Sequence, residues 1–266
     1  MNRLRNGLMS LVSWLVCYLV IVFAGTVSAF GFYVLNRTHV FGARNRGPQS
    51  RLMIVSNHKD SRDSFLIGLV TCFPWLLWKP RLMPYNLADA REGIDSWLLR
   101  FVYRTMRVIP VHRDATGQRH DHAAYLKACE VLNDEGVVHV YPEGTRSISE
   151  ELSLPQPQVG AMALATGATV RPVYYYGRFC PYRKYPGDPP ITWLRPVFGE
   201  NVEWLLDLRT GQLLIVIIGE DITPVEILAM AGDGDHRERN CRVAEGIMER
   251  IRILQQRCLT DIQHAA

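Results

Sequence analysis

The sequence predicts an α/β domain with a central, mostly parallel or mixed sheet flanked by helices, preceded by an apolar N-terminal segment. Short apolar runs of the kind that form buried strands recur along the chain, and segments with helical periodicity stand between them. With 48% hydrophobic and 21% charged residues, the chain has the composition of a folded protein and not of a disordered one.

The individual elements can be placed from composition and periodicity. Strands are expected where apolar and β-branched residues cluster, at Leu52–Ser56, Arg107–Val111, Val137–Tyr141, Thr169–Tyr175 and Gln212–Ile218. Helices are expected between them, at Ser96–Thr105, Ala123–Asn133 and Gln158–Thr166. Gly136 lies just beyond the second of these helices and is a plausible stop signal.

A further helix is expected at the end of the chain. Its apolar residues recur at helical spacing, at Val243, Ile247, Ile251 and Leu254. Asp235 and Glu238 have the spacing of a capping pair at its start. We interpret the apolar stripe as ordinary core contact and not as a functional surface.

The N-terminal segment has the length and composition of a membrane element. No charged residue occurs from Leu8 to Leu35, and a helix of that length would measure about 42 Å, against about 30 Å for a hydrocarbon core. We expect a tilted membrane helix or a re-entrant hairpin that breaks near Gly25 or Gly31. A cleaved signal peptide ending near Ala29 is the third alternative, although the apolar stretch continues past that site.

The chain is therefore expected to consist of a membrane anchor at residues 1–36 and a catalytic domain at residues 51–266, joined by the polar linker Asn36–Ser50. Two arginines precede the apolar segment and three follow it, which favours a catalytic domain on the cytoplasmic side of the bilayer. The net charge of +4 and the lack of basic runs interleaved with aromatic residues argue against nucleic acid as a partner. The six scattered cysteines predict neither a zinc site nor a disulfide framework.

The first candidate for chemistry follows the first predicted strand. Residues Asn57–Asp63 read NHKDSRD, so His58 and Asp63 stand five positions apart in a loop at the end of a strand. A carboxylate that bonds to one imidazole nitrogen fixes the tautomer and raises the basicity of the other nitrogen. This pair suits a general base for a hydroxyl group, although a spacing of this kind also arises by chance.

The second candidate follows another predicted strand and reads YPEGTRS, from Tyr141 to Ser147. Gly144 permits a tight turn, Thr145 adds a hydroxyl donor, and the guanidinium of Arg146 matches the geometry of phosphate oxygens. Glu143 is suited to holding the arginine or a substrate hydroxyl. Elsewhere, Arg113 follows a strand and is a second possible phosphate contact.

Together with Val170–Val173, these blocks resemble the glycerolipid acyltransferase family, which includes 1-acylglycerol-3-phosphate acyltransferase. The resemblance covers about Ser56 to Tyr176 and rests on the family motifs NHxxxxD and FPEGTRS, the latter with Tyr141 in place of phenylalanine. It implies His58 as general base and Asp63 as its partner. It also implies an acceptor phosphate held by five residues: Arg113, Glu143, Gly144, Thr145 and Arg146.

The resemblance further implies the reaction and its partners. The donor would be acyl-CoA or acyl-carrier protein, the acceptor a lysophospholipid such as 1-acylglycerol-3-phosphate, and the product phosphatidic acid, with no metal or further cofactor. Gln158 and Val159 stand where the family often has a basic residue, and Arg171 stands where an apolar residue is commoner. Two alternatives remain open: a tafazzin-like phospholipid–lysophospholipid transacylase, and a membrane-tethered lipid-binding protein without activity.

Overall fold

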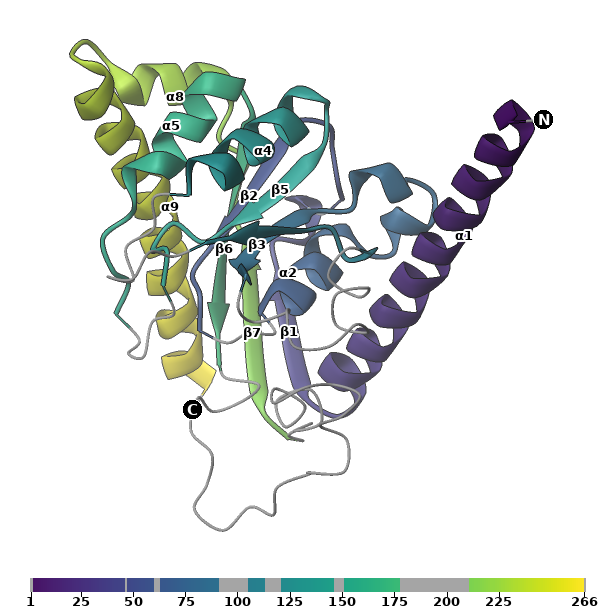
Figure 1. Cartoon of the computed structure of the whole chain (residues 1–266). Coiled ribbons are helices and arrows are strands. Elements are labelled where there is room, and N and C mark those ends of the chain that lie inside the picture. Colours follow the sequence, from purple (N-terminus) through teal and green to yellow (C-terminus); the bar gives the residue numbers. More distant parts are fainter. Residues whose placement is uncertain are drawn as a thin grey trace.

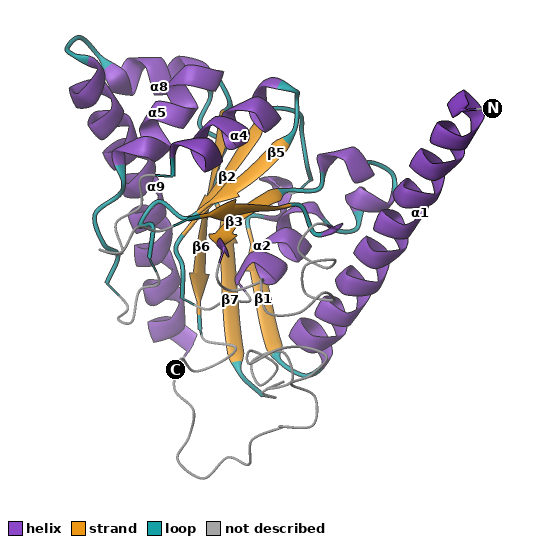
Figure 2. Cartoon of the chain, in the orientation of Figure 1, coloured by secondary structure: helices purple, strands orange, loops and turns teal. Residues whose placement is uncertain are grey.

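The computed structural model describes residues 2–45, 47–59, 63–90, 105–112, 121–145, 151–177 and 211–265. Seven strands within these residues form one mixed sheet with the order β1-β7-β6-β2-β5-β3-β4, and helices cover both of its faces (Figures 1 and 2). The strands are β1 (Arg37–Phe41), β2 (Leu52–Ser56), β3 (Tyr85–Asp89), β4 (Val108–Val111), β5 (Val137–Val140), β6 (Thr169–Tyr176) and β7 (Leu213–Ile218).

The strand directions define a parallel body and a reversed edge. Strands β6, β2, β5, β3 and β4 are parallel to one another. Strand β7 is antiparallel to β6, and β1 is parallel to β7. The expected α/β fold with a mixed sheet and flanking helices is therefore confirmed.

The helices divide between the two faces. One face carries α1 (Asn2–Ala29) and α2 (Asp63–Cys72), and the other carries α4 (His122–Asn133), α5 (Pro157–Thr166), α8 (Pro224–Ala231) and α9 (His236–Ala265). Short helical turns occur at Phe30–Val34, Ala43–Asn45, Trp75–Leu77 and Pro80–Leu82. Figure 1 shows α9 running alongside the sheet and α1 at the opposite side of the domain.

Two apolar clusters follow from the alternation of side chains along the strands. In β2, Leu52 and Ile54 point into the cluster beneath α1 and α2, whereas Met53 and Val55 point into the cluster beneath the other four helices. All five residues of β2 are buried, which explains why this strand reads as a continuous apolar run in the sequence.

Most predicted elements that the structure describes lie within a residue or two of their observed bounds. The expected polar linker contains β1, an edge strand that pairs with β7 through Arg37 opposite Leu213. Strand β3 and helices α2 and α8 were not predicted. The helix predicted at Ser96–Thr105 lies outside the described residues except for Thr105.

The N-terminal segment forms one continuous helix, α1, which a π-helical turn extends to Val34. The alternative of a re-entrant hairpin is wrong, because neither Gly25 nor Gly31 breaks the helix. Its inner face contacts the domain: Ile21 is buried, the hydroxyl of Tyr18 donates to the carbonyl of Leu77 at 3.3 Å, and Gly25 lies against the ring of Phe73.

The membrane-spanning helix that was expected from the sequence is not found. Judged on the residues that the structure describes, none of the helices combines the length and the apolar character needed to cross a membrane.

Candidate active site

The candidate site lies where the parallel strands β2 and β5 end side by side. Val55 pairs with Val140, so the residues that follow these two strands emerge at the same edge of the sheet. His58 comes two residues after β2, and Tyr141 comes directly after β5. The topology thus joins two sequence motifs that lie about eighty residues apart, at the strand edge where α/β folds place reactive groups.

His58 and Asp63 contact each other as predicted from their spacing. The Nδ1 atom of His58 lies 3.2 Å from Oδ2 of Asp63, and the side chains are 14% and 1% exposed. Asp63 is the first residue of α2, where the helix dipole favours a carboxylate, and its Oδ2 also accepts from the amide of Lys59 at 2.5 Å. With the Nδ1 proton directed at Asp63, Nε2 is the nitrogen that can accept a proton.

The backbone around His58 is held by two buried polar side chains. The side-chain amide of Asn57 continues the pairing of β2 with β6. Its Nδ2 donates to the backbone carbonyl of Tyr175 at 2.9 Å, and its Oδ1 accepts from the backbone amide of Tyr175 at 2.8 Å. Glu143 accepts from the amide of His58 at 3.4 Å and from the amide of Ser153 at 2.9 Å. Both residues fix the loop that carries His58.

Tyr141 packs on the imidazole of His58. The ring centroids are 3.8 Å apart and the planes differ by 13°, so the rings are stacked face to face. The hydroxyl of Tyr141 shares a 2.7 Å hydrogen bond with Oγ of Ser64, the second residue of α2. The ring of His139 meets Tyr141 edge-on at 4.6 Å.

A buried hydrogen-bond network lies beneath these rings. Nε2 of His139 is 2.8 Å from Oγ of Ser56, and its Nδ1 is 3.0 Å from Oδ1 of Asn86. The network therefore connects the neighbouring strands β2, β5 and β3. Burial, with a smaller contribution from the charge of His58, lowers the pKa of His139 to about 3, so this imidazole is neutral at physiological pH.

Gly144 and Thr145 lie in the turn that follows β5. Gly144 is buried and adopts a φ of 71°, a left-handed conformation that glycine tolerates, and its amide closes a turn onto the carbonyl of Tyr141 at 3.0 Å. Thr145 follows it and is exposed. Arg113 and Arg146, the two predicted phosphate contacts, lie outside the described residues.

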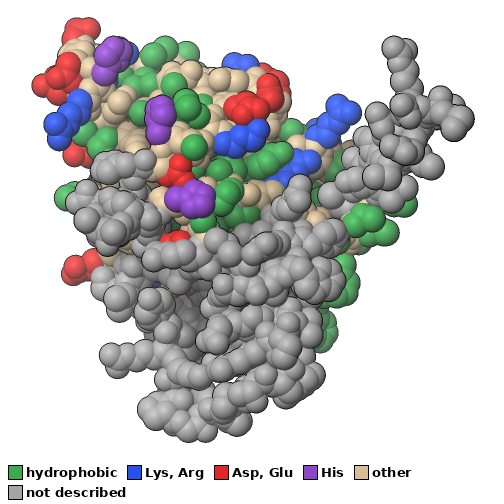
Figure 3. Space-filling model, viewed as in Figure 1, with side chains coloured by type: hydrophobic (Ala, Val, Ile, Leu, Met, Phe, Trp, Pro, Cys, Tyr) green, Lys and Arg blue, Asp and Glu red, His purple; other side chains and the backbone are tan. Residues whose placement is uncertain are grey.

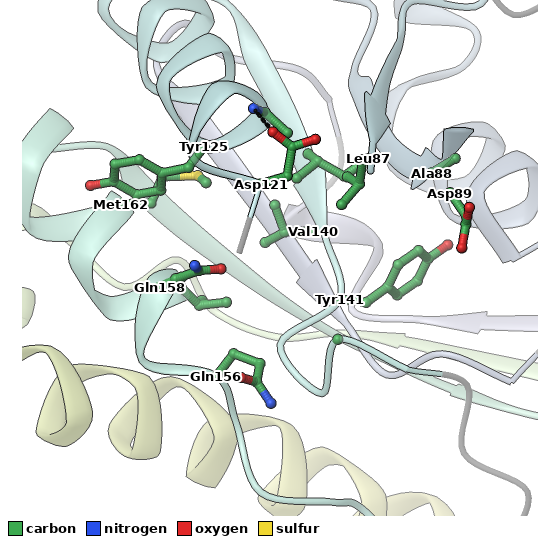
Figure 4. Close-up of a pocket in the computed structure, with 14 residues that line it drawn as sticks. Leu87, Ala88, Asp89, Asp121, Tyr125, Val140, Tyr141, Gln156, Gln158 and Met162 are labelled. Carbon is green, nitrogen blue, oxygen red and sulfur yellow. Dashed lines mark hydrogen bonds between the residues drawn. The ribbon is translucent and has the colours of Figure 1, made fainter. Parts of the chain in front are cut away.

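A pocket of about 90 Å³ adjoins the site. Figure 4 shows Tyr141 and Asp89 on one side of it and Tyr125 and Met162 on the other. Asp121, also in its wall, caps α4 by accepting from Ala124 at 3.0 Å, and its bonds to the backbone, above all to His112, lower the pKa of its carboxyl group. The volume is smaller than the ~150 Å³ of a cavity that holds benzene, so the pocket takes only a short part of a ligand.

Comparison with known proteins identifies the family of the chain. The family model described as Acyltransferase matches residues 37–176, which is more than half of the 266 residues. The chain belongs to the acyltransferase family. Membership in this family implies a lipid substrate and an acyl donor.

A solved structure has a similar fold over most of the chain. The crystal structure of the 1-acyl-sn-glycerophosphate (LPA) acyltransferase PlsC from Thermotoga maritima is similar, with a TM-score of 0.55 and 18% sequence identity over 96% of this chain and 99% of that one. At this identity the likeness concerns the fold. A search of curated proteins found no match.

Several residues of the candidate site were not identified from the sequence. Ser64, Ser56 and Asn86 form hydrogen bonds to residues on other strands or loops. Nothing in their local sequence indicates those partners. His139 could have been singled out from the sequence, because a histidine inside the apolar run Val137–Val140 needs hydrogen-bond partners when it is buried.

Proposed function

We propose that this chain transfers a fatty-acyl group from the thioester of acyl-CoA or acyl-carrier protein to the free hydroxyl of 1-acylglycerol-3-phosphate, giving phosphatidic acid for phospholipid synthesis. The observation that carries the proposal is the contact of His58 with Asp63 at the end of β2, beside Tyr141 and the pocket. Family membership supports the reaction class.

The chemistry needs one base and no covalent enzyme intermediate. Nε2 of His58 removes the proton of the acceptor hydroxyl, and the oxygen attacks the thioester carbonyl. When the carbon–sulfur bond breaks, the thiolate leaves and takes the proton back from the imidazolium. Asp63 stabilises the imidazolium that exists between these two proton transfers.

The acceptor phosphate is assigned to Arg113, Arg146 and Thr145 on the strength of the motif resemblance. Glu143, which the resemblance assigned to the phosphate, is given another role here, because its two oxygens accept from the backbone amides of His58 and Ser153. A carboxylate would also repel a phosphate group. Its proposed role is to hold the loop that carries the base.

We also propose that the enzyme works at the cytoplasmic surface of a bilayer. The outward face of α1 and of the turn that follows it carries an outer stripe of exposed apolar residues, defined as Leu19, Phe23, Val27, Phe30 and Val34, with exposures of 48–70%. In Figure 3, apolar side chains lie along the outer edge of the coloured part of α1. A lipid surface would cover this stripe and supply the long-chain substrates of the proposed reaction.

The test is a turnover assay with purified protein in mixed micelles. With labelled acyl-CoA, we expect phosphatidic acid from 1-acylglycerol-3-phosphate and much slower acylation of a monoacylglycerol, which lacks the phosphate. Equal transfer from a phospholipid donor without any thioester would instead indicate a transacylase. Lipid binding without product would indicate an inactive lipid-binding protein.

The phosphate assignment is tested by substituting Arg146. Loss of a charged hydrogen bond costs about 1.5–3 kcal/mol, so Arg146→Ala is expected to raise the acceptor KM roughly tenfold to a hundredfold. Arg146→Lys should rescue part of the loss, because an ammonium group provides the charge but not the planar pair of donors. An unchanged acceptor KM in both variants would contradict the assignment.

A further inference from the structure

The first turn of α2 contacts both members of the stacked pair, His58 and Tyr141. Asp63 and Ser64 are consecutive residues there, and they hold two different rings: Asp63 contacts Nδ1 of His58, and Ser64 bonds to the hydroxyl of Tyr141. One helix turn therefore fixes both members of the stack. Tyr141 and Ser64 take no part in the proposed proton transfers, so their contacts point to a positioning role.

The contact with Asp63 leaves the imidazole incompletely restrained. At 3.2 Å it is at the long end of the hydrogen-bond range, and the same Oδ2 atom also accepts from the amide of Lys59. A single bond at Nδ1 further permits the ring to tilt about the line that joins Nδ1 to the carboxylate. A second restraint on the face of the ring is needed to aim Nε2 at a substrate hydroxyl.

The ring of Tyr141 supplies that restraint. It lies parallel to the imidazole at a centroid distance of 3.8 Å, and its own position is fixed at two points. Its hydroxyl is bonded to Ser64, and its ring is met edge-on by His139, which Ser56 and Asn86 hold in turn.

We propose that Tyr141 and Ser64 form a positioning pair that fixes the plane of the His58 imidazole for proton transfer. The inference rests on the proposed function, in which His58 is the general base. Stacking against Tyr141 fixes the tilt of the His58 imidazole. The hydrogen bond to Ser64 fixes the position of the Tyr141 ring relative to α2. Neither residue exchanges a proton with the substrate, so the pair acts on the rate of the chemical step and not on acceptor binding.

Substitutions of Tyr141 separate the ring from its hydroxyl. In the full-length protein, Tyr141→Leu removes the stack and is expected to lower kcat by about tenfold to a hundredfold, as misplacement of a reacting group does, with acceptor and donor KM within about twofold of wild type. Tyr141→Phe keeps the ring and should recover most of the lost kcat. A Tyr141→Leu protein that folds, as judged by thermal unfolding, and keeps a wild-type kcat would overturn the proposal, as would a change in KM alone.

The hydrogen bond is tested by a double-mutant cycle. Tyr141→Phe and Ser64→Ala each remove one end of the same bond, so each is expected to lower kcat about threefold, and the double variant should fall no further than either single one. Ser64→Thr, which keeps a hydroxyl, should recover activity. Additive losses, or no loss in either single variant, would overturn the pair, and this cycle decides the matter even if Tyr141→Leu does not fold.

A parallel measurement on His58→Ala distinguishes a failure of the positioning pair from a failure of the proposed mechanism. If His58→Ala loses turnover while the Tyr141 and Ser64 variants do not, only the positioning pair is wrong. If a folded His58→Ala protein keeps normal turnover, the proposed mechanism and the positioning pair are both overturned.

Discussion

His139 is a neutral imidazole inside the domain, and its burial makes stability depend on pH. An unfolded histidine has a pKa near 6.5, whereas that of His139 is lowered to about 3. Above pH 6.5 neither state binds the proton. Below it the unfolded state does, so the free energy of unfolding falls as the pH drops from 6.5 towards 3, by about 1.4 kcal/mol per unit.

We predict that the titration of His139 lowers the free energy of unfolding by roughly 3 kcal/mol between pH 7 and pH 4.5. Denaturant unfolding at both pH values measures it, with His139→Gln as the variant that does not titrate. We expect the variant to be less stable at pH 7 by about 1–3 kcal/mol, because it loses a hydrogen bond to Ser56 or Asn86. Its stability should also decline less in acid, and an equal decline in both proteins would refute the neutral assignment.

At the same scale, the contact of His58 with Asp63 could be predicted from the sequence, whereas the side chains that surround this pair could not. His58 and Asp63 are close in the chain, and the second motif at Tyr141–Ser147 removed the ambiguity of their spacing. The stack of Tyr141 on His58 and its bond to Ser64 exist only because β2 and β5 are neighbours. Strand order is a long-range property that no local pattern encodes.

The contact of α5 with α9 depends on Gly160. A Cβ atom at this position would lie 2.1 Å from the carbonyl oxygen of Asn240 and 2.9 Å from the amide nitrogen of Ala244. Both are backbone atoms of α9 and cannot move aside individually. Gly160→Ala is therefore expected to push the helices apart at a cost of about 1–3 kcal/mol, which exceeds the gain of about 1 kcal/mol in helix propensity.

Gly246 provides the matched control, since it is also a glycine inside a helix. A Cβ atom there would meet the sulfur of Met230 at 2.8 Å, and this flexible side chain can turn away. Gly246→Ala should consequently leave the melting temperature unchanged or raised, while Gly160→Ala lowers it. Equal shifts in the two variants would show that helix propensity, and not the close approach of α5 and α9, decides stability.

The elements that were predicted correctly are those with a clear burial pattern. Helix α9 is an example: Val243, Ile247 and Ile251 are fully buried, and the amide of Glu238 donates to Asp235 at 2.8 Å, as the capping pattern indicated. Strand β1 alternates between exposed and half-buried residues, and β3 is half-buried throughout. Helix α2 buries seven of its ten residues and so has no polar face to reveal its period.

At the scale of the whole molecule, α1 packs against the domain with one face and exposes the outer stripe on the other. The apolar character of the segment was evident from the sequence. That one of its faces contacts the domain, through Tyr18, Ile21 and Gly25, was not, because the contact depends on the folded position of Phe73 and Leu77. The outer stripe lies on the exposed face and is the surface that we propose lipid covers.

The prediction for this surface is a loss of vesicle binding on adding charge to the outer stripe. Leu19→Glu, Phe23→Glu and Val27→Glu act on side chains that are 56%, 70% and 48% exposed, so little stability should be lost. Each removes about 1 kcal/mol of apolar contact with lipid, and together they should weaken binding to anionic vesicles about a hundredfold. Turnover of a water-soluble short-chain acceptor should be kept.

Exposed apolar residues at a distance from α1 supply the control. Val225 and Leu228 on α8 are 75% and 58% exposed, and α8 lies on the opposite side of the molecule in Figure 1. Val225→Glu with Leu228→Glu should leave vesicle binding intact. If this pair weakens binding as much as the substitutions on α1, the outer stripe is not the membrane-facing surface.

The central claim is that His58 is the general base of an acyl transfer, and the turnover of His58→Ala tests it most directly. A positioned general base contributes about 10²–10⁴-fold to the rate. The account predicts that His58→Ala lowers kcat for acylation of 1-acylglycerol-3-phosphate by at least that range while the protein melts as wild type does. A folded His58→Ala protein with kcat within a few-fold of wild type would contradict the account.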